Sequence, residues 1–220
     1  MPRIRVHCFS VSLDGFGAGP DQGPEDPLGV GGHLLHEWLF DTAYGRAMAG
    51  EDDGSTGVDD AWLRRGDAGV GATVMGRNMF GPVRGAWSDE SWTGWWGSDP
   101  PFHHDVFVLT HHERPSLQME GGTTFHFVTD GLEPALARAA EAAGGLDVRI
   151  GGGAATVRTA LARGLVDDLH VVVVPVLLGA GERLWDADGS WPHDYALVEH
   201  EASDAVTHYR FARSPNAGAA

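Results

Sequence analysis

The chain has 220 residues, of which 42% are hydrophobic and 21% charged, and this balance favours a folded domain over a disordered chain. Its formal net charge of −16 repels nucleic-acid phosphates and anionic lipid, so we expect neither a nucleic-acid nor a membrane partner. The single cysteine, Cys8, excludes a disulfide scaffold. With no secretion signal or long apolar segment in the sequence, a cytoplasmic location is the default expectation.

The first half of the chain alternates strands and helices with two long loops. Alternating β-formers predict strands, and leucines with Trp38 at helical spacing predict an amphipathic helix. The predicted strands are 3–12 and 70–75, the helices 33–48 and 58–66, and the long loops 17–32 and 81–104. The second loop contains four of the eight tryptophans, which suggests a pocket or a subunit interface.

The second half continues the alternation and ends in a pair of strands. Strands are predicted at 105–110, 123–128, 147–150, 168–174, 195–200 and 205–212, and helices at 131–143 and 154–163. Such an order implies βαβ units and an α/β fold with a mostly parallel central sheet between two layers of helices. We predict a single domain over residues 1–213, followed by a flexible tail at 214–220.

A glycine-rich turn at residues 150–155 (IGGGAA) lies between a predicted strand and a predicted helix. Glycines let a backbone turn sharply and approach a ligand closely, and the N–H groups that open the next helix favour an anion such as a pyrophosphate. The same glycines also suit a tight turn that binds nothing. A second turn, Gly76-Arg77, follows the strand at 70–75, and its arginine is suited to hold a phosphate.

Four short motifs in order resemble the dihydrofolate-reductase-like superfamily, and most closely its riboflavin-biosynthesis reductase branch. They are residues 12–15 (SLDG), 74–77 (VMGR), 150–153 (IGGG) and 174–181 (VPVLLGAG). The resemblance covers about residues 3–212. It implies a central sheet of about eight strands with a C-terminal antiparallel hairpin, NADPH as hydride donor, and a homodimer.

The resemblance also implies where the cofactor binds. Arg77 would meet the adenosine 2′-phosphate or a nearby phosphate, and the glycine turn would line the pyrophosphate. The implied cofactor residues are Gly76, Arg77, Asn78, Leu109, Thr110, Gly151, Gly152, Gly153, Ala154 and Ala155. One departure stands out: Met79 occupies a position where family members often have a phosphate-binding threonine.

The chemical step needs a substrate pocket and, in some reactions, a proton donor. The resemblance places Asp14 and Ser12 beside the nicotinamide and substrate, although Asp14-Gly15 also suits a plain turn. Glu37 and Asp41 are further acidic candidates on the helix at 33–48, where a solvated helix face is the alternative for both. Trp38 either shapes the substrate pocket or belongs to the core.

Two other kinds of site find little support in the sequence. The paired histidines at 103–104 and 111–112 point to opposite faces of a strand, so we expect no metal site. No GxSxG elbow indicates a hydrolase. The sequence therefore favours an NADPH-dependent reductase of a small heterocycle, either a pterin or a pyrimidine of the riboflavin-pathway type. The alternative is a nucleotide-binding module of the same fold without catalysis.

Overall fold

A computed structural model describes residues 2–81, 85–87, 91–185 and 194–214. Its central sheet has nine strands in the order β10-β11-β8-β1-β7-β3-β4-β6-β5. In chain order they are β1 (Ile4–Ser12), β3 (Val70–Gly76), β4 (Asp105–Leu109), β5 (Leu117–Gln118), β6 (Thr124–Val128), β7 (Asp147–Gly152), β8 (Asp168–Val174), β10 (Tyr195–Ala202) and β11 (Thr207–Arg213). The strands from β8 to β6 are parallel, and β5, β10 and β11 run antiparallel to their neighbours.

This architecture confirms the predicted fold class, with more strands than expected. The additional edge strand β5 comes from a segment that no periodicity marked, and it pairs with β6. A separate two-stranded sheet joins β2 (Phe16–Ala18) to β9 (Glu182–Arg183), so part of the predicted loop at 17–32 is a strand. Within the described residues, no helix is long and apolar enough to cross a membrane.

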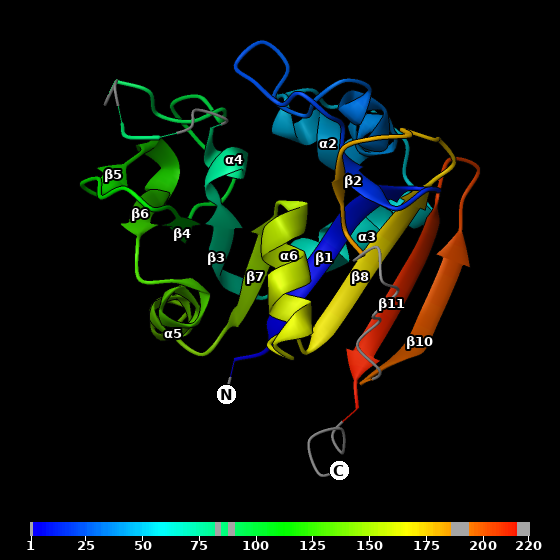
Figure 1. The fold of residues 1–220 in the computed structure, drawn as a ribbon. Coiled ribbons are helices and arrows are strands. Elements are labelled where there is room, and N and C mark those ends of the chain that lie inside the picture. The colour runs from blue at the N-terminus through cyan, green and yellow to red at the C-terminus, as the bar shows by residue number, and fades with distance from the viewer. Residues whose placement is uncertain (1, 82–84, 88–90, 186–193, 215–220) are drawn as a thin grey trace.

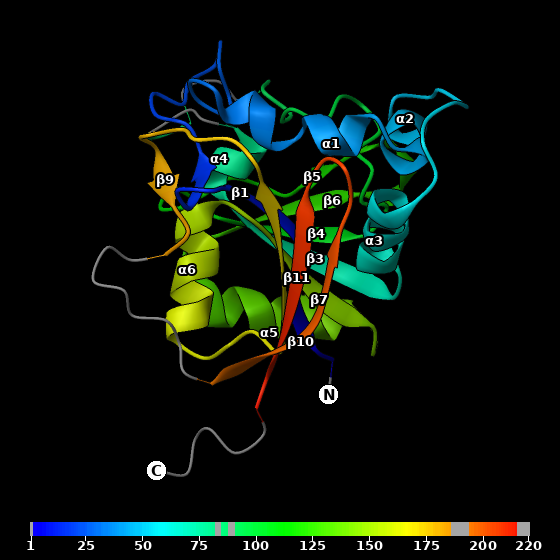
Figure 2. The same cartoon turned by 90° about the vertical axis from the view of Figure 1, so that its right-hand side faces the viewer.

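Helices cover both faces of the sheet (Figures 1 and 2). On one face lie α5 (Leu132–Ala142) and α6 (Ala154–Ala162), and on the other lie η1 (Gly32–Leu35), α1 (Glu37–Phe40), α2 (Ala43–Met48) and α3 (Val58–Asp67). Neighbouring residues of one strand pack into opposite layers, because successive side chains point to opposite faces of the sheet. Val171 packs in the core under α5 and α6, whereas Val172 packs in the core with Trp38 and Leu63.

The single helix predicted at 33–48 is wrong, since the structure divides it into η1, α1 and α2. Thr42 has extended backbone angles, and its hydroxyl accepts the Gly45 N–H, which starts a new helix. At Gly45 a Cβ atom would stand 2.1 Å from Leu39 O, so the two short helices meet where only glycine fits. At the other end of the chain, Ser214 donates its N–H to Asp194 O, and the rest of the predicted tail lies outside the described residues.

The carboxyl ends of the parallel strands lie at one edge of the sheet, at the top in Figure 1. The short helix α4 (Arg77–Phe80) follows β3 directly at this edge. The segment that follows α4 packs a third core around Phe80, Phe102 and Phe125, with Trp87, Trp92 and Trp96 against it. The described part of the tryptophan-rich loop is therefore a packed layer that borders this edge.

Candidate active site

A cavity of about 580 Å³ opens at the carboxyl edge of the parallel strands. A volume of that size is typical of small-molecule and cofactor sites. Every residue that the sequence predicted to bind the cofactor lines it, namely Gly76, Arg77, Asn78, Leu109, Thr110, Gly151, Gly152, Gly153, Ala154 and Ala155. These residues follow β3, β4 and β7, which are neighbours in the sheet, so the strand order brings the separate motifs to one place.

The glycine turn forms the centre of the cavity wall. Gly152 has φ +136°, a conformation that side chains rarely adopt, and the bond between Gly152 and Gly153 is cis. A Cβ atom on Gly153 would meet no described atom within 4 Å, so the backbone there faces open space. The first N–H groups of α6, at Ala154 and Ala155, precede the intrahelical hydrogen bonds and remain available to an anion. The turn therefore has the features of an anion cradle.

Gly76 brings the end of β3 against this turn. A Cβ atom at Gly76 would lie 2.6 Å from Thr156 Oγ1, which is closer than real Cβ contacts come. Met79 packs on the other side, because a Cβ at Gly151 would stand 3.3 Å from its sulfur. Met79, which departs from the family pattern, thus packs against the glycine turn.

Arg77 lies between the cavity and the tryptophan-rich segment. Its guanidinium stacks 3.7 Å from the Trp87 ring centre and donates a hydrogen bond to Gly85 O. Trp87 in turn donates its indole N–H to His112 O, 2.9 Å away. Because His111 and His112 also line the cavity, this end combines one arginine with two imidazoles beside Leu109 and Thr110.

Asp14 and Ser12 are held away from the cavity lining. The Ser12 hydroxyl donates to Asp14 Oδ1 at 2.6 Å, and the N–H groups of Gly179 and Leu178 donate to the same carboxylate. These bonds, the one from Ser12 above all, lower the pKa of Asp14 to about 2. Asp14 is therefore an ionised anchor for the loop after β8, and the prediction that it serves catalysis, with Ser12 binding substrate, is not supported by its position.

The acidic candidates on the broken helix also lie elsewhere. Glu37 and Asp41 are exposed, and neither belongs to the described lining of the cavity. Trp38 is only 5% exposed and packs in the core with Leu35 and Leu63, so the core alternative describes it better than the pocket. The helix predicted to carry them ends at Phe40 and starts again at Ala43, so Glu37 and Asp41 do not share one continuous helix, and their catalytic roles stay predictions.

A family model described as the RibD C-terminal domain matches residues 5–209. The chain belongs to the RibD C-terminal domain family. A search among curated proteins gives no match.

Solved structures similar to this RibD-type chain share its fold at low sequence identity. A putative riboflavin biosynthesis protein from Shewanella sp. PV-4 is 22% identical with a TM-score of 0.60, over 97% of this chain and 99% of that one. A pyrimidine reductase-like protein from Corynebacterium diphtheriae is 16% identical with a TM-score of 0.53, over 96% and 92%. A diaminohydroxyphosphoribosylaminopyrimidine deaminase/5-amino-6-(5-phosphoribosylamino)uracil reductase from Thermotoga maritima is 12% identical with a TM-score of 0.54, over 96% and 56%.

Sequence reasoning missed the part of the RibD-type cavity that β1 forms. Cys8, Phe9 and Ser10 line it from the middle of β1, and His36 lines it from the junction of η1 and α1. At Cys8 the strand bulges with φ +53°, and its register with β8 shifts between Val6 and Phe9. An alternating strand pattern gives no sign of such a bulge, and the continuous-helix model concealed the position of His36.

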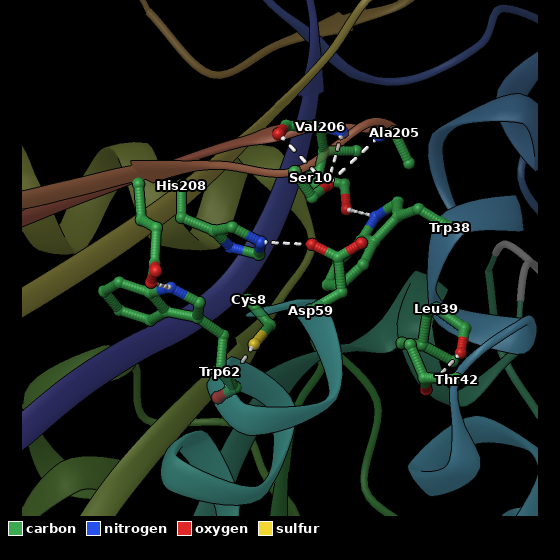
Figure 3. A network of polar contacts seen from close by, with 12 residues as sticks. Cys8, Ser10, Trp38, Leu39, Thr42, Asp59, Trp62, Ala205, Val206 and His208 are labelled. Atoms are coloured by element: carbon green, nitrogen blue, oxygen red, sulfur yellow. Dashed lines mark hydrogen bonds and ion pairs between the residues drawn. The ribbon is translucent and has the colours of Figure 1, made fainter. Parts of the chain in front are cut away.

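A chain of buried imidazoles supports this bulge. The Cys8 N–H donates to His170 Nδ1, so His170 carries its proton on Nε2 and donates it to His208 Nδ1, 3.0 Å away. His208 then donates from Nε2 to Asp59 Oδ1 at 2.7 Å (Figure 3). Burial lowers the pKa of both histidines, which keeps them neutral.

The same region holds the one potential metal-ligand group found among the described residues. It consists of His7, Cys8 and His170, whose ligand atoms lie within 4.8 Å of one another. Both ring nitrogens of His170 already form the hydrogen bonds of the imidazole chain, and burial raises the pKa of the Cys8 thiol. These contacts suit a packed floor beneath the cavity better than a metal centre.

Proposed function

We propose that this protein is an NADPH-dependent reductase that transfers a hydride to a small heterocyclic substrate. The observation that carries the proposal is the convergence of the predicted cofactor residues on one cavity. Membership of the RibD C-terminal domain family supports it, because the Thermotoga relative is named as a uracil-type reductase.

The residues present fit a dinucleotide. The helix N-terminus at Ala154 and Ala155, with open space beside Gly153, suits a pyrophosphate. Arg77, at the end of the cavity formed by β3 and β4, suits the adenosine phosphate. When bound, NADPH would supply a hydride from its nicotinamide ring. Phe9 of β1 and other apolar side chains of the cavity lining would help to exclude water from the reacting atoms.

The sharpest test places a charge at the helix N-terminus. Ala155 is exposed and is the second residue of α6, where a glutamate favours the helix dipole. Ala155→Glu should therefore fold normally and yet repel the pyrophosphate, raising the Kd for NADPH at least tenfold. Ala155→Gln is the matched control, since it adds the same volume without charge. Equal Kd values for the two variants would contradict the placement of the pyrophosphate.

A second test concerns cofactor choice and catalysis. Arg77→Ala should weaken NADPH binding more than NADH binding, because only NADPH carries the 2′-phosphate. An unchanged preference would refute the role of Arg77. Binding of NADPH without oxidation in the presence of any pterin or pyrimidine tested would instead favour the nucleotide-binding module.

A further inference from the structure

The order of the strands gives the cavity two ends. Gly76 and the glycine turn come from the central strands β3 and β7, whereas Leu109 and Thr110 follow β4 on one side. On the other side, β1 contributes Cys8, Phe9 and Ser10, and His36 joins them; we call these four residues the β1 end. The proposed cofactor residues leave the β1 end uncovered, so a second molecule has room there.

His36 presents an imidazole without a partner at this end. Among the described residues, no side-chain or backbone group forms a hydrogen bond with its ring. Burial lowers the pKa of His36 to about 4, so at neutral pH the ring is uncharged, with one N–H donor and one acceptor. His36 is partly buried and lines the cavity, so the donor and the acceptor of its ring are available to a ligand with matching groups.

Ser10 presents a second polar group at the β1 end of the cavity. Its Oγ accepts the Trp38 indole N–H at 3.0 Å, as Figure 3 shows, and its own hydrogen has no acceptor in the described part of the chain. The same indole N–H lies 3.1 Å from Leu35 O, directly before His36 in the sequence. The backbone just before His36 therefore lies close to the indole that Ser10 binds, and Ser10 and His36 both line the cavity.

The surroundings of this pair disfavour an anion. Phe9 and Cys8 are uncharged, since burial raises the pKa of the thiol, and Glu182 adds a carboxylate to the cavity lining. Arg77 is the one arginine in the described lining and lies at the other end of the cavity, so no guanidinium is available here to hold a phosphate. A planar ring with adjacent N–H and carbonyl groups matches one imidazole and one hydroxyl.

We propose that Ser10 and His36 bind the substrate, and that this substrate is an uncharged heteroaromatic ring with adjacent N–H and carbonyl groups and no phosphate. The inference rests on the proposed function, because it assigns to the substrate the part of the cavity that the cofactor leaves. It distinguishes this chain from a reductase of a phosphoribosylated pyrimidine.

The test uses pteridine-2,4-dione, a fluorescent and uncharged ring of this kind, titrated into the free protein and into the NADPH-loaded protein. His36→Leu and Ser10→Ala should each weaken its binding about tenfold and leave the Kd for NADPH unchanged. His36→Gln, which retains hydrogen-bonding groups, should bind more tightly than His36→Leu. His33→Leu is the matched control, because His33 is exposed and lies outside the described lining of the cavity. Uridine should displace the probe better than uridine 5′-monophosphate does.

Each outcome decides one of the two proposals. Failure of the probe to bind the wild type, equal binding by wild type, His36→Leu and Ser10→Ala, or stronger displacement by the monophosphate would overturn the inference. Binding of the probe with the expected variant effects, but no binding of NADPH, would leave the inference standing and refute the proposed cofactor.

Discussion

Mild acid should destabilise this protein well before its carboxylates titrate. Burial lowers the pKa of His7, His36 and His104 to about 4 each, from an ordinary value of 6.5. Between pH 6.5 and pH 4 these histidines are protonated in the unfolded chain but neutral in the folded chain, so the free energy of unfolding falls as the pH drops below 6.5. On going from pH 8 to pH 5.5, each of the three histidines costs at most about 1.4 kcal/mol, and the least buried of them, His104, costs less because solvent screens it.

The total is therefore up to about 4 kcal/mol, a large part of the roughly 5–15 kcal/mol that stabilises a typical protein. His170 and His208 act in the same direction, because burial also lowers the pKa of both. The pKa of Asp14, lowered to about 2, has its effect below pH 4 and does not contribute in this range.

Urea unfolding followed by tryptophan fluorescence at pH 8, 7, 6 and 5.5 measures the effect. His104→Gln should reduce the loss of stability over this range by about 1 kcal/mol. His33→Gln is the control, because that ring is 67% exposed and should be solvated in both states. Stability that is constant from pH 8 to pH 5.5, or a slope that His104→Gln leaves unaltered, would refute the reasoning.

Three further predictions concern packing, anchoring and assembly. Gly76→Ala should lower the free energy of unfolding in urea by about 1–3 kcal/mol, because its Cβ would meet Thr156 Oγ1. A second change, Thr156→Ala, should recover most of this loss, whereas simple additivity of the two changes would contradict the contact. Asp14→Asn should lower the Tm, because it removes the charge that accepts the N–H groups of residues 178–179, and should leave the Kd for NADPH unchanged. A higher Kd for NADPH in this variant would show that Asp14 acts in the binding site. We expect a homodimer by analytical ultracentrifugation, and Leu197→Glu, on the exposed edge strand β10, should yield monomers; a monomeric wild type would refute this.

The parts of the fold that could be predicted are those set by local pattern. The continuous apolar run of β8 and the alanine-rich α5 appear where the sequence indicates them. The cofactor motifs converge because parallel strands bring their carboxyl ends together, a rule that needs only the order of the elements. Local signals sufficed for these features.

The features that could not be predicted depend on distant contacts. The imidazole chain joins residues from β1, β8, β11 and α3, and no spacing in the sequence reveals it. Asp14 looks like a catalytic acid until its partners at residues 178–179, far along the chain, are known. His36 lines the cavity because it lies at the junction of η1 and α1, and a single helix at 33–48 has no such junction.

The central place of β1 has a consequence for synthesis on the ribosome. This strand is made first, yet its neighbours in the sheet are β7 and β8, where Arg5 faces Arg149 and Ser12 faces Val174. Both edges of β1 therefore stay without their native partners until most of the chain has been translated. During that interval an apolar strand with two open edges is exposed to wrong pairing. We expect nascent chains that stop before β8 to depend on chaperones. The sheet should form late in translation, when β8 pairs with β1.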